Sequence, residues 1–511
     1  MPAGSFPLRF RTQEQFAALR DLLRAAEYTE SSVCRRLGID SFLELSKVMP
    51  GRILTAELAG PLDALIRLFL ECEPMTRSEI ESWLGVSAFT LLCELDLLRP
   101  DAAHPEQCIS PVGLHPTQSL YLVCDRGGEL ASLAEDVVYP AILENTQYFL
   151  GLLPATPCRT FLDLGTGTGV AALMAASRYA EHAWACDITE RSVHFSEFNR
   201  RLNGLENVTV ARGDLYEPVE GRMFDRIVTH PPYVPVASST CVFRDGGQDG
   251  EQIVRRIIEG LPRFLSPGGR FYCQTLASDR EEDLLEERIR KWLGEREAEF
   301  DLALITETAR EPADFIGRAM QKGTHRREEL EYWSTVFREL KVKFLVYGCI
   351  LIQRKQEDRA PFTVRVQKGP HSGLMETEWL LNLHTAAWKA GARLLDSRPS
   401  KSDHLHLAVL HSVRDGELVP EEFMFRVTHP FEGECKCAAW IAALVGRCDG
   451  ETSGWSLFED LKQAGTIHPE SSADEFALVL RALVSAGYLE IEPFGVPSVR
   501  KDERSFRASF P

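Results

Sequence analysis

Four consecutive residues, His230, Pro231, Pro232 and Tyr233, are the part of the sequence best suited to chemistry. Two successive prolines fix φ and remove two amide donors, so the backbone presents carbonyl acceptors on a rigid edge. The tyrosine beside them offers a flat face against which a planar group can stack. These four residues are therefore the candidate catalytic residues, and they predict a site that holds a planar nitrogen or oxygen nucleophile.

A glycine-rich loop upstream, GTGTG at residues 165–169, follows a strand-like run and precedes a helix of small residues. Glycines at alternate positions permit a tight turn, and they let a ligand lie on the main chain beside the amides of the helix. Asp187 ends the next strand about 20 residues on, where a carboxylate can bind a ribose. The candidate cofactor-binding residues are Asp163, Gly165, Thr166, Gly167, Gly169, Asp187, Asp214 and Leu215.

Alternating strand and helix patterns between residues 126 and 357 predict an α/β, doubly wound domain. The ligand crevice of such a sheet lies at the carboxyl ends of its strands, where the loop and the acidic residues meet. NAD or a flavin is the competing ligand, although a dinucleotide loop usually has the spacing GxGxxG. A long charged helical connection, residues 307–340, could cover the site. The seven expected strands are residues 160–165, 182–187, 208–214, 225–230, 269–275, 300–306 and 343–353.

Three motifs within residues 135–275 resemble those of a known family. The aspartate before GTGTG resembles motif I of class I S-adenosylmethionine-dependent methyltransferases. HPPY resembles the (N/D)-P-P-(Y/F) motif of the HemK/PrmC-like release-factor glutamine N5-methyltransferases, and GGQDG at residues 246–250 resembles their GGxDG loop. The resemblance implies a seven-stranded Rossmann-like methyltransferase domain and S-adenosyl-L-methionine as the cofactor, with Asp163 near its amino-acid portion. It also implies that the first motif residue and a proline carbonyl accept both hydrogens of an NH₂ group, which is catalysis by orientation.

His230 stands where the family has Asn or Asp. A neutral imidazole can accept one hydrogen bond, but with an ordinary pKa of about 6.5 it can also take a proton. A histidine at this position suits an amine, hydroxyl or imidazole acceptor that must lose a proton, rather than a glutamine amide. The HPPY and GGQDG features make a methyltransferase that acts on a nitrogen of a protein or other macromolecule the first expectation. A small-molecule N- or O-methyltransferase with His230 as general base is the alternative, and a cofactor-binding regulator without activity comes third, because a sensor needs no reactive edge.

At 511 residues the chain should contain several domains. The pattern predicts a helical, winged-helix-like domain over residues 1–125, the methyltransferase domain over 126–357, and an α+β domain over 358–511 that ends in a winged-helix-like module. The third helix of the first domain, residues 87–98, has no Lys or Arg, so protein contact is a better expectation than DNA binding.

The net charge of −18 argues against extensive nucleic-acid binding. No apolar run approaches the roughly 20 residues of a membrane span, and the N-terminus lacks a signal-like segment, so a cytoplasmic protein without a membrane anchor is expected. The 13 cysteines form no CxxC pair. No metal site is predicted, and His404 and His406 are not expected to bind a metal. The expected partner is a protein or small-molecule methyl acceptor, and the flanking domains could form a homodimer.

Overall fold

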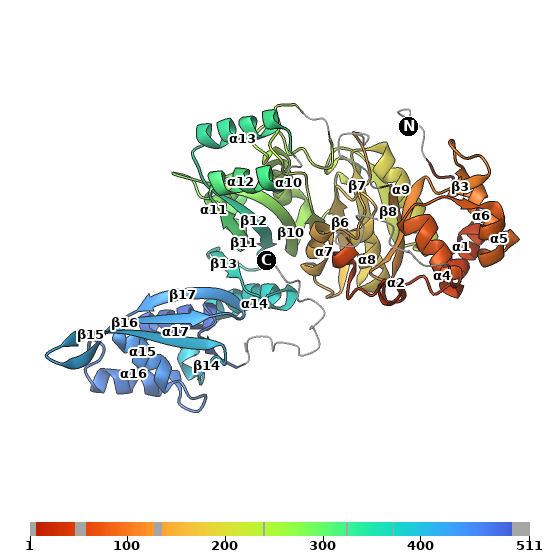
Figure 1. Ribbon diagram of the computed structural model, residues 1–511. Coiled ribbons are helices and arrows are strands. Elements are labelled where there is room, and N and C mark those ends of the chain that lie inside the picture. The colour runs from red at the N-terminus through yellow and green to blue at the C-terminus, as the bar shows by residue number, and fades with distance from the viewer. Residues whose placement is uncertain are drawn as a thin grey trace. The chain divides into compact units, whose positions relative to one another are not determined.

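The computed structural model describes residues 7–45, 58–126, 135–238, 241–322, 325–370 and 372–492 (Figure 1). These residues separate into two compact units. The first contains residues 7–301 and 310–361, and the second contains residues 302–309 and 362–492. The division into three domains at residues 125 and 357 stays a prediction.

A mostly parallel sheet forms the centre of the first unit, with the strand order β8-β7-β6-β9-β10-β12. The first five strands of that order run parallel, and β12 is antiparallel to β10. The predicted α/β class is confirmed, and each of the seven expected strands forms. They are β6 (Cys158–Leu164), β7 (Ala180–Asp187), β8 (Val208–Arg212), β9 (Phe224–Thr229), β10 (Leu265–Arg280), β11 (Phe300–Arg310), whose central residues belong to the second unit, and β12 (Val342–Arg354).

Successive strands are added on one side of β6 as β7 and β8 and on its other side as β9 and β10. The carboxyl ends of β6 and β9 therefore lie at a topological switch point. Helix α9 shows how local sequence sets the element boundaries: the hydroxyl of Thr189 accepts a hydrogen bond from the amide of Ser192, and the helix ends at Gly204 with φ of +67°. The helices of this part are α7 (Glu144–Gly151), α8 (Val170–Arg178), α9 (Glu190–Asn203), η4 (Glu217–Val219), α10 (Gln252–Phe264), α11 (Leu285–Leu293), η5 (Gly294–Glu299), α12 (Pro312–Lys322) and α13 (Arg327–Glu339).

The N-terminal part of the first unit is mostly helical, as expected. The capping box at Thr76 is present, because its amide donates to Glu79 Oε2 at 2.8 Å and its hydroxyl accepts from the Glu79 amide. Its elements are α1 (Gln13–Ala25), α2 (Glu30–Leu37), η1 (Phe42–Glu44), α4 (Pro61–Leu65), the π-helix η2 (Ile66–Leu70), β1 (Met75–Thr76), α5 (Arg77–Leu84), α6 (Val86–Glu94), β2 (Arg99–Pro100), β3 (Gln107–Ile109), β4 (Val112–Thr117) and β5 (Leu120–Asp125).

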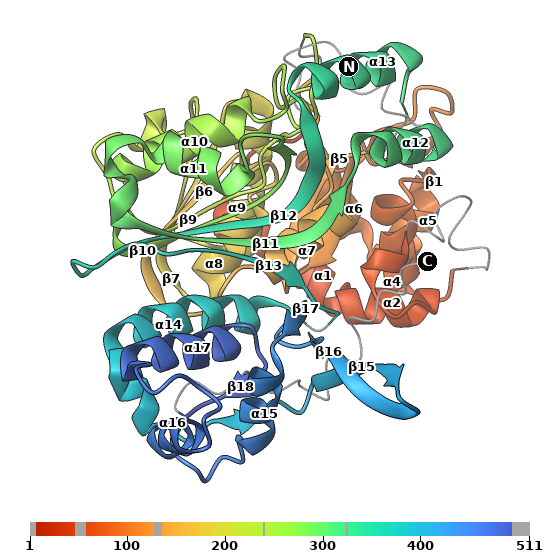
Figure 2. The same cartoon turned by 90° about the vertical axis from the view of Figure 1, so that its left-hand side faces the viewer.

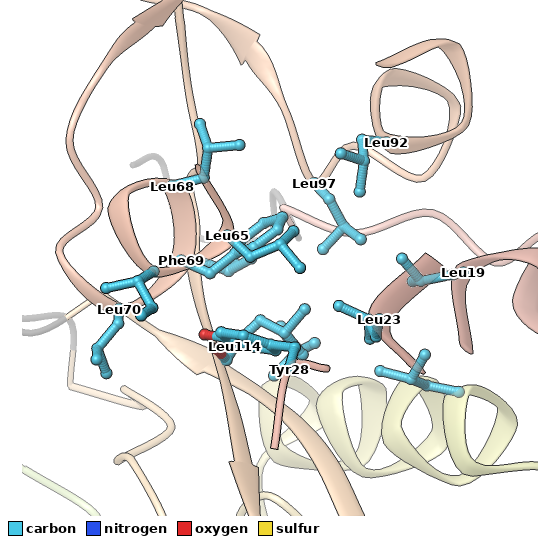
Figure 3. Packing of buried hydrophobic residues seen from close by; sticks show 14 of the residues in the cluster. Leu19, Leu23, Tyr28, Leu65, Leu68, Phe69, Leu70, Leu92, Leu97 and Leu114 are labelled. Atoms are coloured by element: carbon cyan, nitrogen blue, oxygen red, sulfur yellow. Dashed lines mark hydrogen bonds between the residues drawn. The ribbon is translucent and has the colours of Figure 1, made fainter. Parts of the chain in front are cut away.

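This N-terminal part shares a hydrophobic core with helix α9 (Figure 3). The rings of Phe16 and Phe198 meet edge to face at 5.1 Å, and both side chains are buried. The amide group of Asn199 bonds the backbone of β5 in both directions, with its Oδ1 2.7 Å from the Val123 nitrogen and its Nδ2 3.0 Å from the Val123 oxygen. The helix that follows the second strand of the α/β sheet is thus also a core element of the N-terminal part.

The second unit is α+β, with the strand order β15-β16-β17-β13-β11 and helices (Figure 2). Strands β13, β15 and β16 lie in this unit, and β14 pairs with β18. Among the described residues no helix has the length and apolar character to cross a membrane, and no cluster of metal-ligating side chains occurs. Besides the central part of β11, the elements of the second unit are β13 (Thr363–Lys368), α14 (Leu374–Ala390), η6 (Gly391–Asp396), β14 (Ser400–Lys401), β15 (Leu405–Arg414), β16 (Glu417–Val427), β17 (Phe431–Cys437), α15 (Ala439–Arg447), α16 (Gly454–Gln463), α17 (Ala473–Ser485) and β18 (Leu489–Glu490).

Candidate active site

The glycine loop lies between the end of β6 and the start of α8. Gly165, Gly167 and Gly169 have φ of +71°, +56° and +86°, in the region that favours glycine. A Cβ atom added at Gly165 or Gly167 would meet no atom within 4 Å. One side of the loop is therefore open to a ligand that lies against the main chain.

Asp187, at the end of β7, contacts this loop directly. Its Oδ2 accepts from the Gly167 amide at 3.0 Å, and its Oδ1 accepts from the Thr189 amide at 3.0 Å. The carboxylate is 8% exposed. The second strand end and the glycine loop are thus joined, as the sequence predicted, beside the open face of the loop.

Asp214 and Leu215 follow β8. Arg256 of α10 donates to Asp214 Oδ2 at 2.7 Å, a partner that the sequence pattern did not indicate because it is 42 residues away. Leu215 has a φ of +52°, in the left-handed region that non-glycine residues seldom adopt. The Arg256 contact and this backbone conformation define the third strand end of the crevice.

Asp163 lies behind the glycine loop and is 3% exposed. The Thr166 hydroxyl donates to Asp163 Oδ2 at 2.5 Å. Burial raises the pKa of the Asp163 carboxyl to about 7, and the nearby charge of Asp187 acts in the same direction. A cationic ligand group beside Asp163 would favour its charged form.

The His-Pro-Pro-Tyr edge begins where β9 ends. The Thr229 hydroxyl donates to the Leu164 oxygen at 2.9 Å, which ties this strand end to the start of the glycine loop. Burial lowers the pKa of His230 to about 4, so the imidazole is neutral near pH 7. Its ring lies 5.6 Å from the ring of Phe149 and 6.0 Å from that of Tyr233, centroid to centroid.

Sequence reasoning missed three residues that contact this edge. Phe149 packs against His230, Asn145 Nδ2 lies 3.4 Å from the Tyr233 hydroxyl, and the ring of Tyr347 meets that of Tyr233 edge-on at 6.1 Å. The first two are on α7 and the third is on β12. No spacing rule links positions so far apart in the chain, and only the apolar character of Phe149 gave a signal.

The GGQDG loop packs directly on the backbone of the His-Pro-Pro-Tyr edge, residues 230–233, which is called the acceptor edge below. A Cβ atom at Gly246 would lie 2.7 Å from the Cα of Tyr233, and one at Gly250 would lie 2.6 Å from the Tyr233 oxygen. The Gly246 amide also donates to the Val234 oxygen at 2.9 Å. These glycines are required because the loop approaches the edge more closely than any side chain permits.

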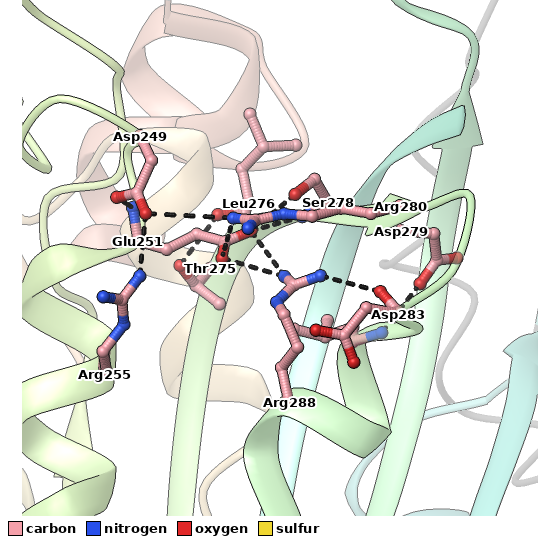
Figure 4. A network of polar contacts seen from close by, with 11 residues as sticks. Asp249, Glu251, Arg255, Thr275, Leu276, Ser278, Asp279, Arg280, Asp283 and Arg288 are labelled. Atoms are coloured by element: carbon pink, nitrogen blue, oxygen red, sulfur yellow. Dashed lines mark hydrogen bonds and ion pairs between the residues drawn. The ribbon is translucent and has the colours of Figure 1, made fainter. Parts of the chain in front are cut away.

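A buried ion network holds the far end of that loop (Figure 4). Glu251, which is 1% exposed, accepts from Arg288 Nη2 at 2.7 and 2.8 Å and from the Ser278 amide at 2.8 Å. Asp249 accepts from Arg255 at 2.8 Å. The loop is thereby joined to β10 and α11.

The connection over residues 307–340 contacts, through helix α13, the residues that follow the His-Pro-Pro-Tyr edge and the GGQDG loop. Trp333 Nε1 donates to the Pro235 oxygen at 2.9 Å, and the Tyr332 hydroxyl donates to the Gln248 oxygen at 3.1 Å. Glu329 pairs with Arg244, just before the GGQDG loop. The helix therefore lies beside the acceptor edge.

A family model described as "Methyltransferase small domain" matches residues 141–298, which include both the glycine loop and the acceptor edge. The chain is 36% identical over 132 residues to a ribosomal protein uL3 glutamine methyltransferase of Bradyrhizobium diazoefficiens, covering 23% of this chain and 41% of that one. It is 30% identical over 154 residues to a putative protein N5-glutamine methyltransferase of Methanocaldococcus jannaschii, covering 29% and 76%. A release factor glutamine methyltransferase of Gloeobacter violaceus is 33% identical over 129 residues, covering 23% and 45%.

These matches and the mostly parallel sheet define the class as the class I S-adenosylmethionine-dependent methyltransferases. Within that class the chain belongs to the HemK/PrmC-like family, whose cofactor is S-adenosyl-L-methionine. It spans less than half the length of the Bradyrhizobium and Gloeobacter relatives.

Proposed function

We propose that this chain methylates the side-chain amide nitrogen of a glutamine in a protein. The observation that carries the proposal is a neutral His230 on a rigid proline edge beside an open glycine loop. The names of the three relatives add support, because each describes a glutamine methyltransferase.

The cofactor end of the site fits S-adenosyl-L-methionine, which supplies an electrophilic methyl group when bound. The open faces of Gly165 and Gly167 would accept it against the main chain. Asp163 would meet its ammonium group, Asp187 its ribose hydroxyls, and Asp214 with Leu215 its adenine.

The acceptor end of the site would act by orientation. An amide NH₂ group has two hydrogens, and the neutral imidazole of His230 and the carbonyl of Pro231 supply one acceptor each. Tyr233 stacks against the amide plane. The nitrogen lone pair would then be aimed at the methyl group. As the N–C bond forms, the bond between the methyl carbon and the cofactor's sulfur would break, and one N–H proton would pass from the nitrogen to water.

A base role for His230, which would suit a small-molecule N- or O-methyltransferase, is the weaker alternative. A base works best when its pKa is near the working pH, and the pKa of His230 is about 4. Orientation needs only a neutral ring, which this pKa provides across the physiological range.

We further infer that the N-terminal part is a winged-helix-like module that contacts the protein substrate. The winged-helix interpretation is supported by the order of its elements, which is a helix followed by β1, α5, α6, β2 and β3. The three strands form a small sheet in the order β1-β3-β2. Helix α6 carries no Lys or Arg, which favours protein over DNA. Substrates such as ribosomal proteins and release factors would place the reaction in the cytoplasm.

The test is an incubation of the purified chain with methyl-labelled cofactor and a lysate from cells that lack the gene. Protein, RNA and small molecules are then separated, and labelled protein is digested for tandem mass spectrometry. We expect label in protein and a methyl group on a glutamine side-chain nitrogen. Label confined to RNA or to small molecules would refute the proposal.

A further inference from the structure

Strand β15 is an edge strand of unusual length and composition. It runs from Leu405 to Arg414 and pairs on one side only, with β16. Among the described residues no strand pairs with its other side. An edge of this kind carries a row of backbone donors and acceptors that can pair with a further strand.

The β15–β16 hairpin also exposes aliphatic side chains. The exposed fractions are 47% for Leu407, 59% for Leu410, 73% for Val413 and 71% for Leu418. Figures 1 and 2 show that the hairpin extends past helices α15, α16 and α17 of its own unit. Those helices therefore do not cover its outer part.

The strand lacks the protection that edge strands usually have. Residues 405–413 contain no Asp, Glu, Lys, Arg or Pro, in a chain with a net charge of −18. The one register shift between β15 and β16 is a bulge in β16, where Glu421 has no partner between the pairs Leu410–Glu422 and His411–Pro420. By contrast, β8 at the edge of the other unit's sheet has five residues and ends in Arg212. Charges, proline and short length are the usual means of preventing edge pairing.

We propose that β15 pairs antiparallel with β15 of a second copy of this chain and forms a dimer with a continuous sheet. A two-fold axis perpendicular to the sheet requires that directly opposed residues point to the same face. Centred on Leu410, the pairing places the two Leu410 side chains against each other and Leu407 opposite Val413 of the second copy. The three most exposed aliphatic residues of β15 are then covered.

Charge and self-complementarity select a second copy over another partner. Two chains that each carry −18 repel each other, so they associate best through a surface without ionised side chains. In the register centred on Leu410, Arg414 lies opposite His406 and no two acidic residues of β15 are opposed. A foreign basic or acidic peptide would find no opposite charge on residues 405–413.

The test is the mass of the full chain in solution. Light scattering and sedimentation equilibrium at micromolar concentrations should give twice 57.4 kDa for the native protein. Leu410→Lys places two ammonium groups opposite each other and should raise the dimer dissociation constant about tenfold or more. Leu418→Lys, at a site of similar exposure on the inner strand β16, should leave the mass unchanged.

A register test uses self-crosslinking in a Cys435→Ser background, because Cys435 is the exposed native cysteine among the described residues. Leu410→Cys should form an intermolecular disulfide on mild oxidation, since the residue on the axis faces itself, and Leu418→Cys should not. A native protein that is monomeric at all micromolar concentrations would overturn the proposal. The edge strand would then be available for pairing with a peptide of another protein. A dimer that Leu410→Lys leaves intact, or that Leu418→Lys breaks equally, would also overturn it.

Discussion

Asp163 illustrates how one buried side chain can link cofactor binding to pH. Burial raises the pKa of its carboxyl to about 7, and a bound cation favours the charged form. Below pH 7 the free protein holds a proton there that binding must release. We therefore expect affinity for S-adenosyl-L-methionine to rise as pH increases through 7, with proton release at pH 6 detectable by calorimetry in two buffers of different ionisation enthalpy.

Asp163→Asn is the control, since its uncharged amide should weaken binding and remove the pH dependence. Thr166→Val removes only the hydroxyl that donates to Asp163, so the pKa of the carboxyl should rise. The pH range over which the affinity increases should then shift to higher pH. Affinity that is independent of pH in the native protein would contradict this account.

His230 gives the second prediction at the scale of one residue. Because burial lowers its pKa to about 4, protonation should affect the rate only as the pH falls toward that value. His230→Asn, which restores the residue type of the resembled motif, should keep most of the activity and the same rate profile between pH 6 and 8. His230→Phe keeps a flat ring without an acceptor and should lose about tenfold to a thousandfold in kcat, the cost of an absent orienting hydrogen bond.

The comparison of the two substitutions separates orientation from base catalysis. A base role would make both variants inactive and would give the native enzyme a rate that depends on a group titrating near neutrality. Rescue of activity by Asn, with none by Phe, supports orientation.

At the scale of elements, the acceptor edge depends on the loop and helices around it. Glu251 is buried with Arg288, so Glu251→Gln leaves a buried guanidinium without its counter-charge. Breaking a buried pair in this way costs about 3–5 kcal/mol in the free energy of unfolding, which urea denaturation would measure.

The matched control for this prediction is Glu282→Gln, on the exposed pair with Lys341 at 3.6 Å. Exposed pairs contribute about 0–1 kcal/mol, so this change should be near neutral. Equal effects of the two substitutions would show that the buried network does not hold the loop.

The first unit as a whole depends on helix α9, which packs against β7 and β8 of the sheet and also completes the hydrophobic core of the N-terminal part. Phe198 is fully buried against Phe16, so Phe198→Ala should lower the free energy of unfolding by about 3–5 kcal/mol. Met223→Ala, at a residue that is 42% exposed, should change it little.

Unfolding of the first unit should also be a single transition, because its N-terminal part and its α/β part share α9. We expect far-UV circular dichroism and tryptophan fluorescence to follow the same curve. A separate early transition of the N-terminal part, with little effect of Phe198→Ala, would contradict the shared core.

The sequence predicted more of the fold than of the acceptor site. All seven expected strands of the α/β pattern form, because alternation and glycine turns are local properties. The helical pattern of residues 1–125 did not show that β3 pairs with β1 and β2 while β4 and β5 form a separate hairpin. Helix α14 was not expected at all.

By itself the sequence determined the open glycine loop, the acidic strand ends and the proline edge, because glycine and proline impose their backbone geometry wherever they occur. Only the tertiary structure decided that His230 is neutral, because its pKa depends on how deeply the fold buries the ring. Only the tertiary structure also brings Asn145 and Tyr347 to Tyr233, and Trp333 to Pro235 just beyond it, from three distant segments of the chain. Solvation and long-range packing are properties of the folded chain, and no local pattern encodes them.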